Sequence, residues 1–215
     1  MSGRDHILER IRTRLAARPR GIHDRRAEVE AHIAAHPRSP QPRPAVELVA
    51  AFRDRVLKLA STCDHVARAA EVPGAIGRYL AEHALPDRAV CWPALAALDW
   101  PGVGLTVETR TARGDDLVGI TGAYCGIAET GTLVALSGPD TPGSVSLLPE
   151  THIAVLPCER IVAAMEDVWT LLRTEHGELP RAVNFISGPS RTADIEQTVT
   201  LGAHGPSRVH IVLVG

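Results

Sequence analysis

A single glutamate stands in a turn between two apolar segments of the chain. Glu129 is followed by Thr130 and Gly131, with one apolar run over residues 123–128 before them and another over 132–137 after them. The pattern predicts a carboxylate at the end of a strand, beside a glycine that permits close approach to the backbone. Such a carboxylate can act as a nucleophile or a general base. The alternative is a turn glutamate that is solvated or bonded to nearby backbone amides.

A second group of polar residues lies in the segment 187–194, of sequence SGPSRTAD. We expect a strand to end there and a helix to begin. The free amides of a helix N-terminus, with the hydroxyls of Ser187, Ser190 and Thr192 and the guanidinium of Arg191 beside them, would bind a carboxylate or phosphate. The alternative is that a hydroxyl only caps the helix, while the acids that follow complement the helix dipole.

Histidines and cysteines give no metal site by their spacing. His32 and His36 are four residues apart but lack the glutamate of the zinc-binding HExxH pattern. The cysteines lack the CxxC pairs that converge thiolates on zinc or on iron–sulfur clusters, so we expect no metal. His152 and His204 are the histidines that could line the site, with a structural role as the alternative. The four cysteines are Cys63, Cys91, Cys125 and Cys158.

Composition argues against several classes of function. The chain balances 23 Lys and Arg against 25 Asp and Glu and contains three Trp, two Tyr and two Phe. Nucleic-acid binders usually carry a basic field and aromatic stacking platforms, so we expect no nucleic-acid partner. Residues 137–143 match neither a phosphate-binding loop nor a dinucleotide fingerprint, and we expect no cofactor to be bound by this chain.

Hydropathy predicts where the protein resides. No run of about 18 apolar residues is present, which argues against a membrane span. The first 20 residues are charged at short intervals and lack the apolar core of a secretory signal. We therefore expect a cytoplasmic protein.

The elements that must position the candidate residues follow a strand–helix–strand order. Apolar runs without polar alternation, such as HIAVL and HIVLV, are typical of parallel strands covered on both faces. We therefore expect an α/β fold of three layers, with a mostly parallel sheet and helices on both of its faces. Strands are predicted over residues 64–69, 88–92, 103–108, 123–128, 132–137, 152–156, 183–187 and 209–214, and helices over 46–60, 73–85, 160–173 and about 191–204.

The first 44 residues differ from the rest. Ile7, Leu8, Ile11 and Leu15 recur on one narrow helical stripe beside a basic face. Prolines over residues 37–44 then favour an extended linker. We predict a helical arm and Pro-rich linker over residues 1–44 and an α/β domain over 45–215. The arm either docks on its own domain or on a neighbour, or is a solvated charged helix. The sequence is compatible with a homo-oligomer and does not give the oligomeric state.

Three blocks of sequence resemble the lactate utilisation domain, and specifically its protein C branch. They are GITGAYCGIAETGTLV at residues 119–134, SLLPETHIAVLP at 146–157 and NFISGPSRTADIEQTVTLGAHGP at 184–206. The resemblance is firm from about Asp116 onward and looser over 46–103. It implies a fold similar to the ribose-5-phosphate isomerase and CoA-transferase group.

The resemblance also implies a function. The chain would be a subunit required for oxidation of L-lactate to pyruvate together with iron–sulfur partner proteins, itself without a redox cofactor. CoA-transferases of the related fold use a turn glutamate as nucleophile, which makes Glu129 the catalytic candidate. One alternative is a stand-alone enzyme acting on a phosphorylated or CoA-linked organic acid, with Glu129 as nucleophile or base and Ser190 and Arg191 holding the small anionic acid. Another is a purely structural interaction protein.

Overall fold

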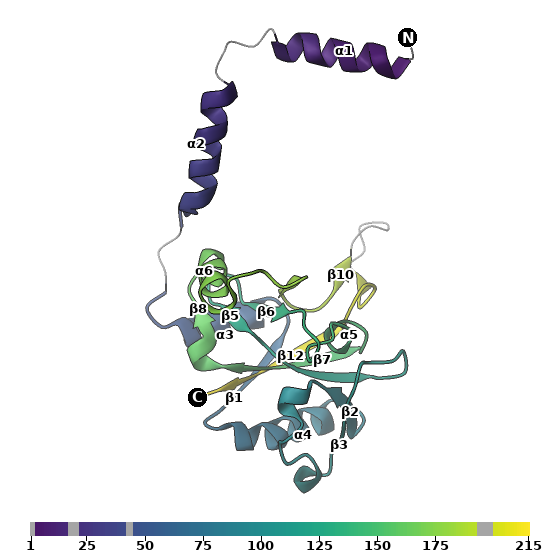
Figure 1. Ribbon diagram of the computed structural model, residues 1–215. Helices are drawn as coiled ribbons and strands as arrows, with labels where there is room; N and C mark the ends of the chain where they lie inside the picture. Colours follow the sequence, from purple (N-terminus) through teal and green to yellow (C-terminus); the bar gives the residue numbers. More distant parts are fainter. Residues whose placement is uncertain (1–2, 17–21, 42–44, 193–199) are drawn as a thin grey trace. The chain divides into compact units, whose positions relative to one another are not determined.

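The computed structural model describes residues 3–16, 22–41, 45–192 and 200–215, without the side chains of residues 16 and 22–25. The chain divides into two compact units, Met1–Gln41 and Pro42–Gly215. The first unit contains α1 (Gly3–Ala16) and α2 (Ile22–Ala35). The second is the α/β unit, and it contains every other element in Figure 1. No helix within the described ranges is long and apolar enough to cross a membrane.

A parallel sheet of six strands forms the centre of the α/β unit. Its order is β1-β12-β7-β4-β2-β3, and every pairing is parallel. The central strands β7 and β12 are buried along almost their whole length, as expected for strands covered on both faces. The strand bounds are β1 Thr62–Val66, β2 Arg88–Cys91, β3 Thr106–Thr109, β4 Val118–Gly122, β7 Thr151–Pro157 and β12 Arg208–Val214.

Alternate side chains of the sheet pack in two separate cores. On one face, Ile153 belongs to a cluster with Ile76 of α4 (Val72–Glu82). On the other face, Leu156 packs in a cluster with Phe52 of α3 (Leu48–Lys58). The two helices thus cover opposite faces of the sheet, as Figure 1 shows. The predicted fold class, α/β with a mostly parallel sheet and helices on both faces, is confirmed.

A smaller sheet lies beyond α3 and adds a layer that the sequence pattern did not predict. Its order is β8-β5-β6-β9, and β6 pairs antiparallel with both β5 and β9. Its outer face packs against α6 (Met165–His176), where Val134 meets Val168 and Leu172 in a buried cluster. The strand bounds are β5 Cys125–Ile127, β6 Thr132–Leu136, β8 Ile161–Val162 and β9 Val183–Ile186.

One predicted element is wrong. The helix expected over about 191–204 is instead a pair of short antiparallel strands, β10 (Arg191–Thr192) and β11 (Thr200–Leu201), at the positions that the structure describes. Asp194 and Glu196, expected to complement that helix, lie outside the described residues. The pattern also missed β4, which is short and contains two glycines. The remaining elements are α5 (Ser144–Leu147) and the 3₁₀ turns Ala69–Glu71, Pro93–Leu95, Pro101–Val103 and Cys158–Arg160.

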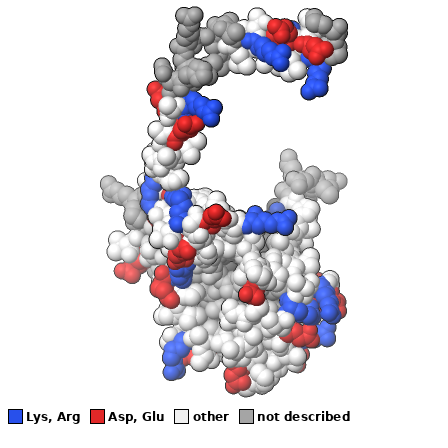
Figure 2. All heavy atoms as spheres, in the orientation of Figure 1, with Lys and Arg blue, Asp and Glu red and all other residues white. Residues whose placement is uncertain are grey.

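Charge is distributed without a single-sign field on the face shown in Figure 2. There, basic and acidic side chains of the α/β unit are interspersed. This distribution fits the formal net charge of -2 and gives that face no basic surface of the kind that attracts nucleic acid.

Candidate site at the turn between β5 and β6

The turn that carries Glu129 packs directly on α3. Gly131 has a φ of 66°, and a Cβ at this position would lie 2.7 Å from Arg55 Cβ and 2.8 Å from Val56 N. Side chains rarely adopt this backbone conformation, and here one would also collide with the helix. The glycine in the sequence is therefore required both by the turn and by the close approach of α3.

Glu129 is held by its backbone and not by its side chain. Its N–H donates to Ala163 O at 3.1 Å, and Gly131 N–H closes the turn on Ile127 O at 2.9 Å. The side chain is half-buried. Among the residues that the structure describes, none donates a hydrogen bond to the carboxylate or forms an ion pair with it. The carboxylate is therefore available to a ligand, a proton or water.

A chain of three hydroxyls runs from the turn to the end of β9. Thr130 Oγ1 lies 2.7 Å from Thr132 Oγ1, which lies 2.7 Å from Ser187 Oγ. Thr132 is buried, whereas Thr130 and Ser187 are exposed. The structure thus joins two residues predicted in separate segments. It does so through Thr132, the first residue of β6, which sequence reasoning missed.

Arg191 lies at the C-terminal end of α3, not at a helix N-terminus. Its Nη2 donates to the carbonyl of Leu59, the C-cap residue, at 3.0 Å. Gly188, with a φ of 81°, approaches the same carbonyl so closely that a Cβ would lie 2.7 Å from it. A cation there satisfies a free carbonyl and complements the helix dipole. At Arg191 and Thr192, strand β10 thus stands where a helix N-terminus was expected, residues 193–199 lie outside the described residues, and Arg191 has a structural contact.

Ser190 stabilises the β10–β11 hairpin through three hydrogen bonds. Its N–H donates to Pro206 O at 2.8 Å, its carbonyl accepts from Gly202 N at 3.0 Å, and its Oγ accepts from His204 N at 3.3 Å. It therefore does not cap a helix. Thr192 is half-buried in β10, where it pairs with Thr200 of β11.

His152 is enclosed in the core of the large sheet. It is 1% exposed, and its Nε2 shares a 2.8 Å hydrogen bond with Thr121 Oγ1 on the neighbouring strand β4. No described residue bonds to its Nδ1. Burial disfavours the charged ring and lowers the pKa of His152 to about 4. The side-chain hydrogen bond found for His152 among the described residues is therefore to the large sheet and not to the turn that carries Glu129.

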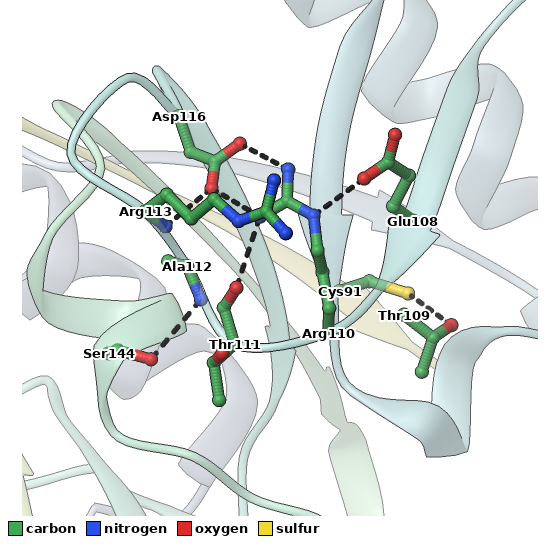
Figure 3. A network of polar contacts seen from close by, with 9 residues as sticks. All are labelled: Cys91, Glu108, Thr109, Arg110, Thr111, Ala112, Arg113, Asp116 and Ser144. Carbon is green, nitrogen blue, oxygen red and sulfur yellow. Dashed lines mark hydrogen bonds and ion pairs between the residues drawn. The ribbon is translucent and has the colours of Figure 1, made fainter.

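A third polar cluster lies at the end of β3, shown in Figure 3. Arg110 donates to both carboxylate oxygens of Asp116, at 2.6 and 2.8 Å, and also to Glu108. Asp116 accepts a further bond from the N–H of Arg113 at 2.6 Å. The Arg110 hydrogen bonds hold the pKa of Asp116 below its usual value. These charges satisfy one another and stabilise the loop, so the cluster does not form a ligand site.

The fold is an α/β domain with a parallel six-stranded sheet and a second, smaller sheet. Its candidate site is the turn beside α3, where the carboxylate of Glu129 has no partner among the described residues. The family model of the LUD domain matches residues 95–214, more than half of the chain. The chain belongs to the LUD domain family. The matched segment contains Glu129, His152, Ser187 and Arg191, whereas α3 lies before it.

Relatives carry names from lactate metabolism. Lactate utilization protein C of Bacillus subtilis is 37% identical over 133 residues, 56% of this chain and 55% of that protein. The protein of the same name from Halalkalibacterium halodurans is 46% identical over 100 residues, 45% of this chain and 44% of that protein. The chain spans about half the length of these curated relatives.

A solved structure supports the fold. A DUF162 family protein from Deinococcus radiodurans superposes with a TM-score of 0.57 and is 26% identical. The match covers 81% of this chain and all of that one.

Proposed function

We propose that the chain is a subunit required for the oxidation of L-lactate to pyruvate, acting together with iron–sulfur partner proteins. The observation that carries the proposal is the family segment itself. Residues 95–214 contain both the glutamate turn and the Ser187 segment, and relatives in this family are named lactate utilization protein C. About half of each of these relatives lies outside the matched region. The contacts with iron–sulfur partners are therefore part of the proposal.

The proposal places the electron acceptor on the partners. Converting the CH–OH of lactate to a carbonyl releases two electrons and two protons, and an acceptor must take them. In this chain Cys91 is buried in β2 beneath α4 and Cys125 in β5 beneath α6. Burial raises the pKa of both thiols, that of Cys125 to about 12, which disfavours the thiolate form that binds iron. Among the described residues, no three His, Cys, Asp or Glu side chains lie together as metal ligands would, and we therefore assign the iron–sulfur clusters to the partners.

The turn is the place that we assign to a small anionic organic acid. One of the exposed hydroxyls, that of Thr130 or that of Ser187, can donate to a carboxylate, because the single proton of the Thr132 hydroxyl can be given to that residue while the other donates to Thr132. Arg191 adds positive charge at the C-terminal end of α3, the helix on which the turn packs. Glu129 would then accept the proton released from a bound hydroxyl group.

Growth and co-purification test this proposal. A strain that lacks the gene should fail to grow on lactate while growing normally on glucose, and the intact gene should restore growth. Tagged chain from lactate-grown cells should retain proteins that contain iron and acid-labile sulfide. Normal growth of the deletion strain on lactate would overturn the proposal.

A second candidate, a stand-alone enzyme acting on a CoA-linked or phosphorylated organic acid, is favoured by one observation. The half-buried carboxylate of Glu129 accepts no hydrogen bond from a described residue. Its oxygen can therefore attack an acyl group and form an acyl anhydride. Incubation of the purified chain alone with acyl-CoA and borohydride distinguishes the candidates. A thioester trapped and reduced on Glu129 supports the enzyme, and an unmodified chain excludes this chemistry for the acyl-CoA used.

A further inference from the structure

The three hydroxyls beside the glutamate turn share a limited number of protons. Thr132 Oγ1 lies 2.7 Å from Thr130 Oγ1 and 2.7 Å from Ser187 Oγ. Among the described residues, no other group is bonded to the Thr132 hydroxyl. Thr132 is 2% exposed, so its single proton goes to one of these two neighbours, because a buried hydroxyl without an acceptor is costly. The other neighbour then donates its own proton to Thr132.

The two ends of this hydroxyl chain therefore offer a ligand different groups. The neighbour that accepts from Thr132 keeps its own proton and can donate it outward. The neighbour that donates to Thr132 has used its proton and offers only lone pairs. Thr130 and Ser187 are both exposed, so the hydroxyl chain presents one donor and one acceptor at the surface.

The spacing of the two ends suits a small hydroxy acid. Thr130 Oγ1 and Ser187 Oγ are each 2.7 Å from the same atom, so they can be no further apart than twice this distance. A carboxylate and a hydroxyl on its neighbouring carbon can bridge such a gap. The carboxylate accepts from the donor end, and the ligand hydroxyl donates to the acceptor end. An acid without that hydroxyl satisfies only one end.

A cation adjoins the Ser187 end of the hydroxyl chain. Gly188 approaches the carbonyl of Leu59 so closely that a Cβ would lie 2.7 Å from its oxygen. Arg191 donates to the same carbonyl at 3.0 Å. The guanidinium therefore lies next to the segment that carries Ser187, and it attracts a carboxylate bound there.

Charges of both signs adjoin the Thr130 end. Glu129 precedes Thr130 in the chain, and the Cβ of Arg55 lies against Gly131. These two charges offset one another, so this end attracts a carboxylate less than the Ser187 end does. The ligand hydroxyl is therefore assigned to Thr130, beside the carboxylate that would take its proton.

We propose that Thr132 determines specificity: it sets one donor and one acceptor at the turn, and so selects a 2-hydroxy acid over acids that lack the hydroxyl. The inference rests on the proposed function, because it takes the turn as the place of the organic acid. Thr132 does not touch the ligand and acts through Thr130 and Ser187, so it is a positioning residue.

Titration of the intact chain with L-lactate and propionate tests the selectivity. Propionate lacks only the hydroxyl, so the parent should bind lactate ~3-fold to 10-fold more tightly in NMR titrations, the contribution of one hydrogen bond. In Thr132→Val the two outer hydroxyls can both donate to a carboxylate, so the two affinities should become about equal. Thr132→Ser restores the hydroxyl and should restore the preference.

Two control variants separate selectivity from charge and stability. Thr174→Val removes an exposed hydroxyl that donates to Thr170 O within α6 at 2.9 Å, and it should bind both acids like the parent. Arg191→Gln should weaken both acids by the same factor and leave their ratio unchanged. Thermal unfolding of Thr132→Val should remain near that of the parent, because the two exposed hydroxyls can bond to water instead.

The outcome of these titrations is independent of growth and co-purification. Equal affinities of the parent for lactate and propionate would overturn the inference, as would a preference for lactate that survives in Thr132→Val. A parent that binds neither acid would overturn it together with the placement of the acid at the turn. In each case the subunit role would stand if the deletion strain fails to grow on lactate.

Discussion

Glu129 and Glu175 experience different environments within the same domain. Glu175 accepts from both terminal nitrogens of Arg160, at 2.6 and 3.0 Å, and from the Tyr124 hydroxyl at 2.7 Å. These bonds, chiefly those from Arg160, lower the pKa of Glu175 to about 2. The hydrogen bonds of Glu175 therefore connect α6 to residues next to the small sheet. The carboxylate of Glu129, by contrast, has no donor among the described residues.

Replacement of Glu129 by glutamine separates catalysis from turn structure. Glutamine preserves size and an acceptor oxygen, so the free energy of unfolding should change by ~1 kcal/mol or less. A nucleophile or general base would lose its reactive electron pair, which typically costs ~100-fold to 10,000-fold in rate. We expect Glu129→Gln to melt near the parent temperature and to fail to restore growth on lactate.

The matched control for this substitution is Glu178→Gln. Glu178 is an exposed glutamate just beyond α6, and no described residue bonds to its side chain. It should restore growth fully. Full growth with a stably expressed Glu129→Gln chain would remove Glu129 from catalysis and leave the subunit proposal without a chemical role for the turn.

Two buried histidines predict how stability depends on pH. Burial lowers the pKa of both His152 and His210 from 6.5 to about 4. Between these values the unfolded chain binds protons that the folded chain does not, so the free energy of unfolding falls as the pH falls. The stabilisation is complete above pH 6.5 and is lost progressively down to about pH 4. Each histidine should contribute a slope on the order of 1 kcal/mol per pH unit within that window.

Urea unfolding at pH values from 4.5 to 7 measures this slope. Replacing His152 by Gln removes one titrating ring, so the variant should lose stability less steeply on acidification than the parent. His65, which is exposed, provides the control through His65→Gln. Equal slopes in the parent and His152→Gln would show that His152 is not protonated on unfolding in this range.

At the scale of elements, three glycines determine how α3 meets the small sheet. A Cβ at Gly126 would lie 2.9 Å from Phe52 Cε2, and those at Gly131 and Gly188 would collide with the C-terminal half of α3. Gly131→Ala should therefore lower the free energy of unfolding by ~2–4 kcal/mol, through backbone strain and overpacking together. Gly114→Ala, where a Cβ meets nothing within 4 Å, is the control and should be nearly neutral in the same urea titration.

Apolar patterning predicted the elements whose own residues carry a clear hydropathy signal. The strands β7 and β12 follow from apolar runs in the sequence, and α3 and α4 follow from amphipathic spacing. The segment after Ser187 has no such signal. Its hairpin depends on contacts with distant residues, such as Ser190 N to Pro206 O and Arg191 to Leu59 O. Local propensity cannot anticipate such contacts.

The candidate site was predicted only where its residues carry a signal in the local sequence. Glu129 and Gly131 were predicted because a carboxylate and a glycine between two strands are visible in sequence. The link from Thr130 of this turn to Ser187 was not, because it requires β6 to pair with β9 about 50 residues later and Thr132 to bridge the two hydroxyls. His152 was predicted from its place at a strand end, but sequence alone could not show that its side chain faces the core.

At the scale of the whole molecule, the two units predict that the α/β unit is stable without the arm. Residues 45–215 contain the four buried apolar clusters of the described chain. A chain truncated to these residues should melt within ~2 °C of the parent under conditions where the parent is monomeric. Thermal unfolding followed by circular dichroism checks this, and a much lower midpoint would place the arm within the folding unit.

The position of β12 in the sheet also has a consequence for biosynthesis. β1 hydrogen-bonds only to β12 within the large sheet, and Thr62 faces His210 across 148 residues of sequence. A ribosome must therefore release almost the entire domain before β1 finds its neighbour and before β7 acquires its second one. Until then the apolar faces of α3 and α4 have an incomplete sheet to cover. Such long-range closure slows folding and exposes the nascent chain to aggregation, so this domain should depend on chaperones during synthesis more than its modest size suggests.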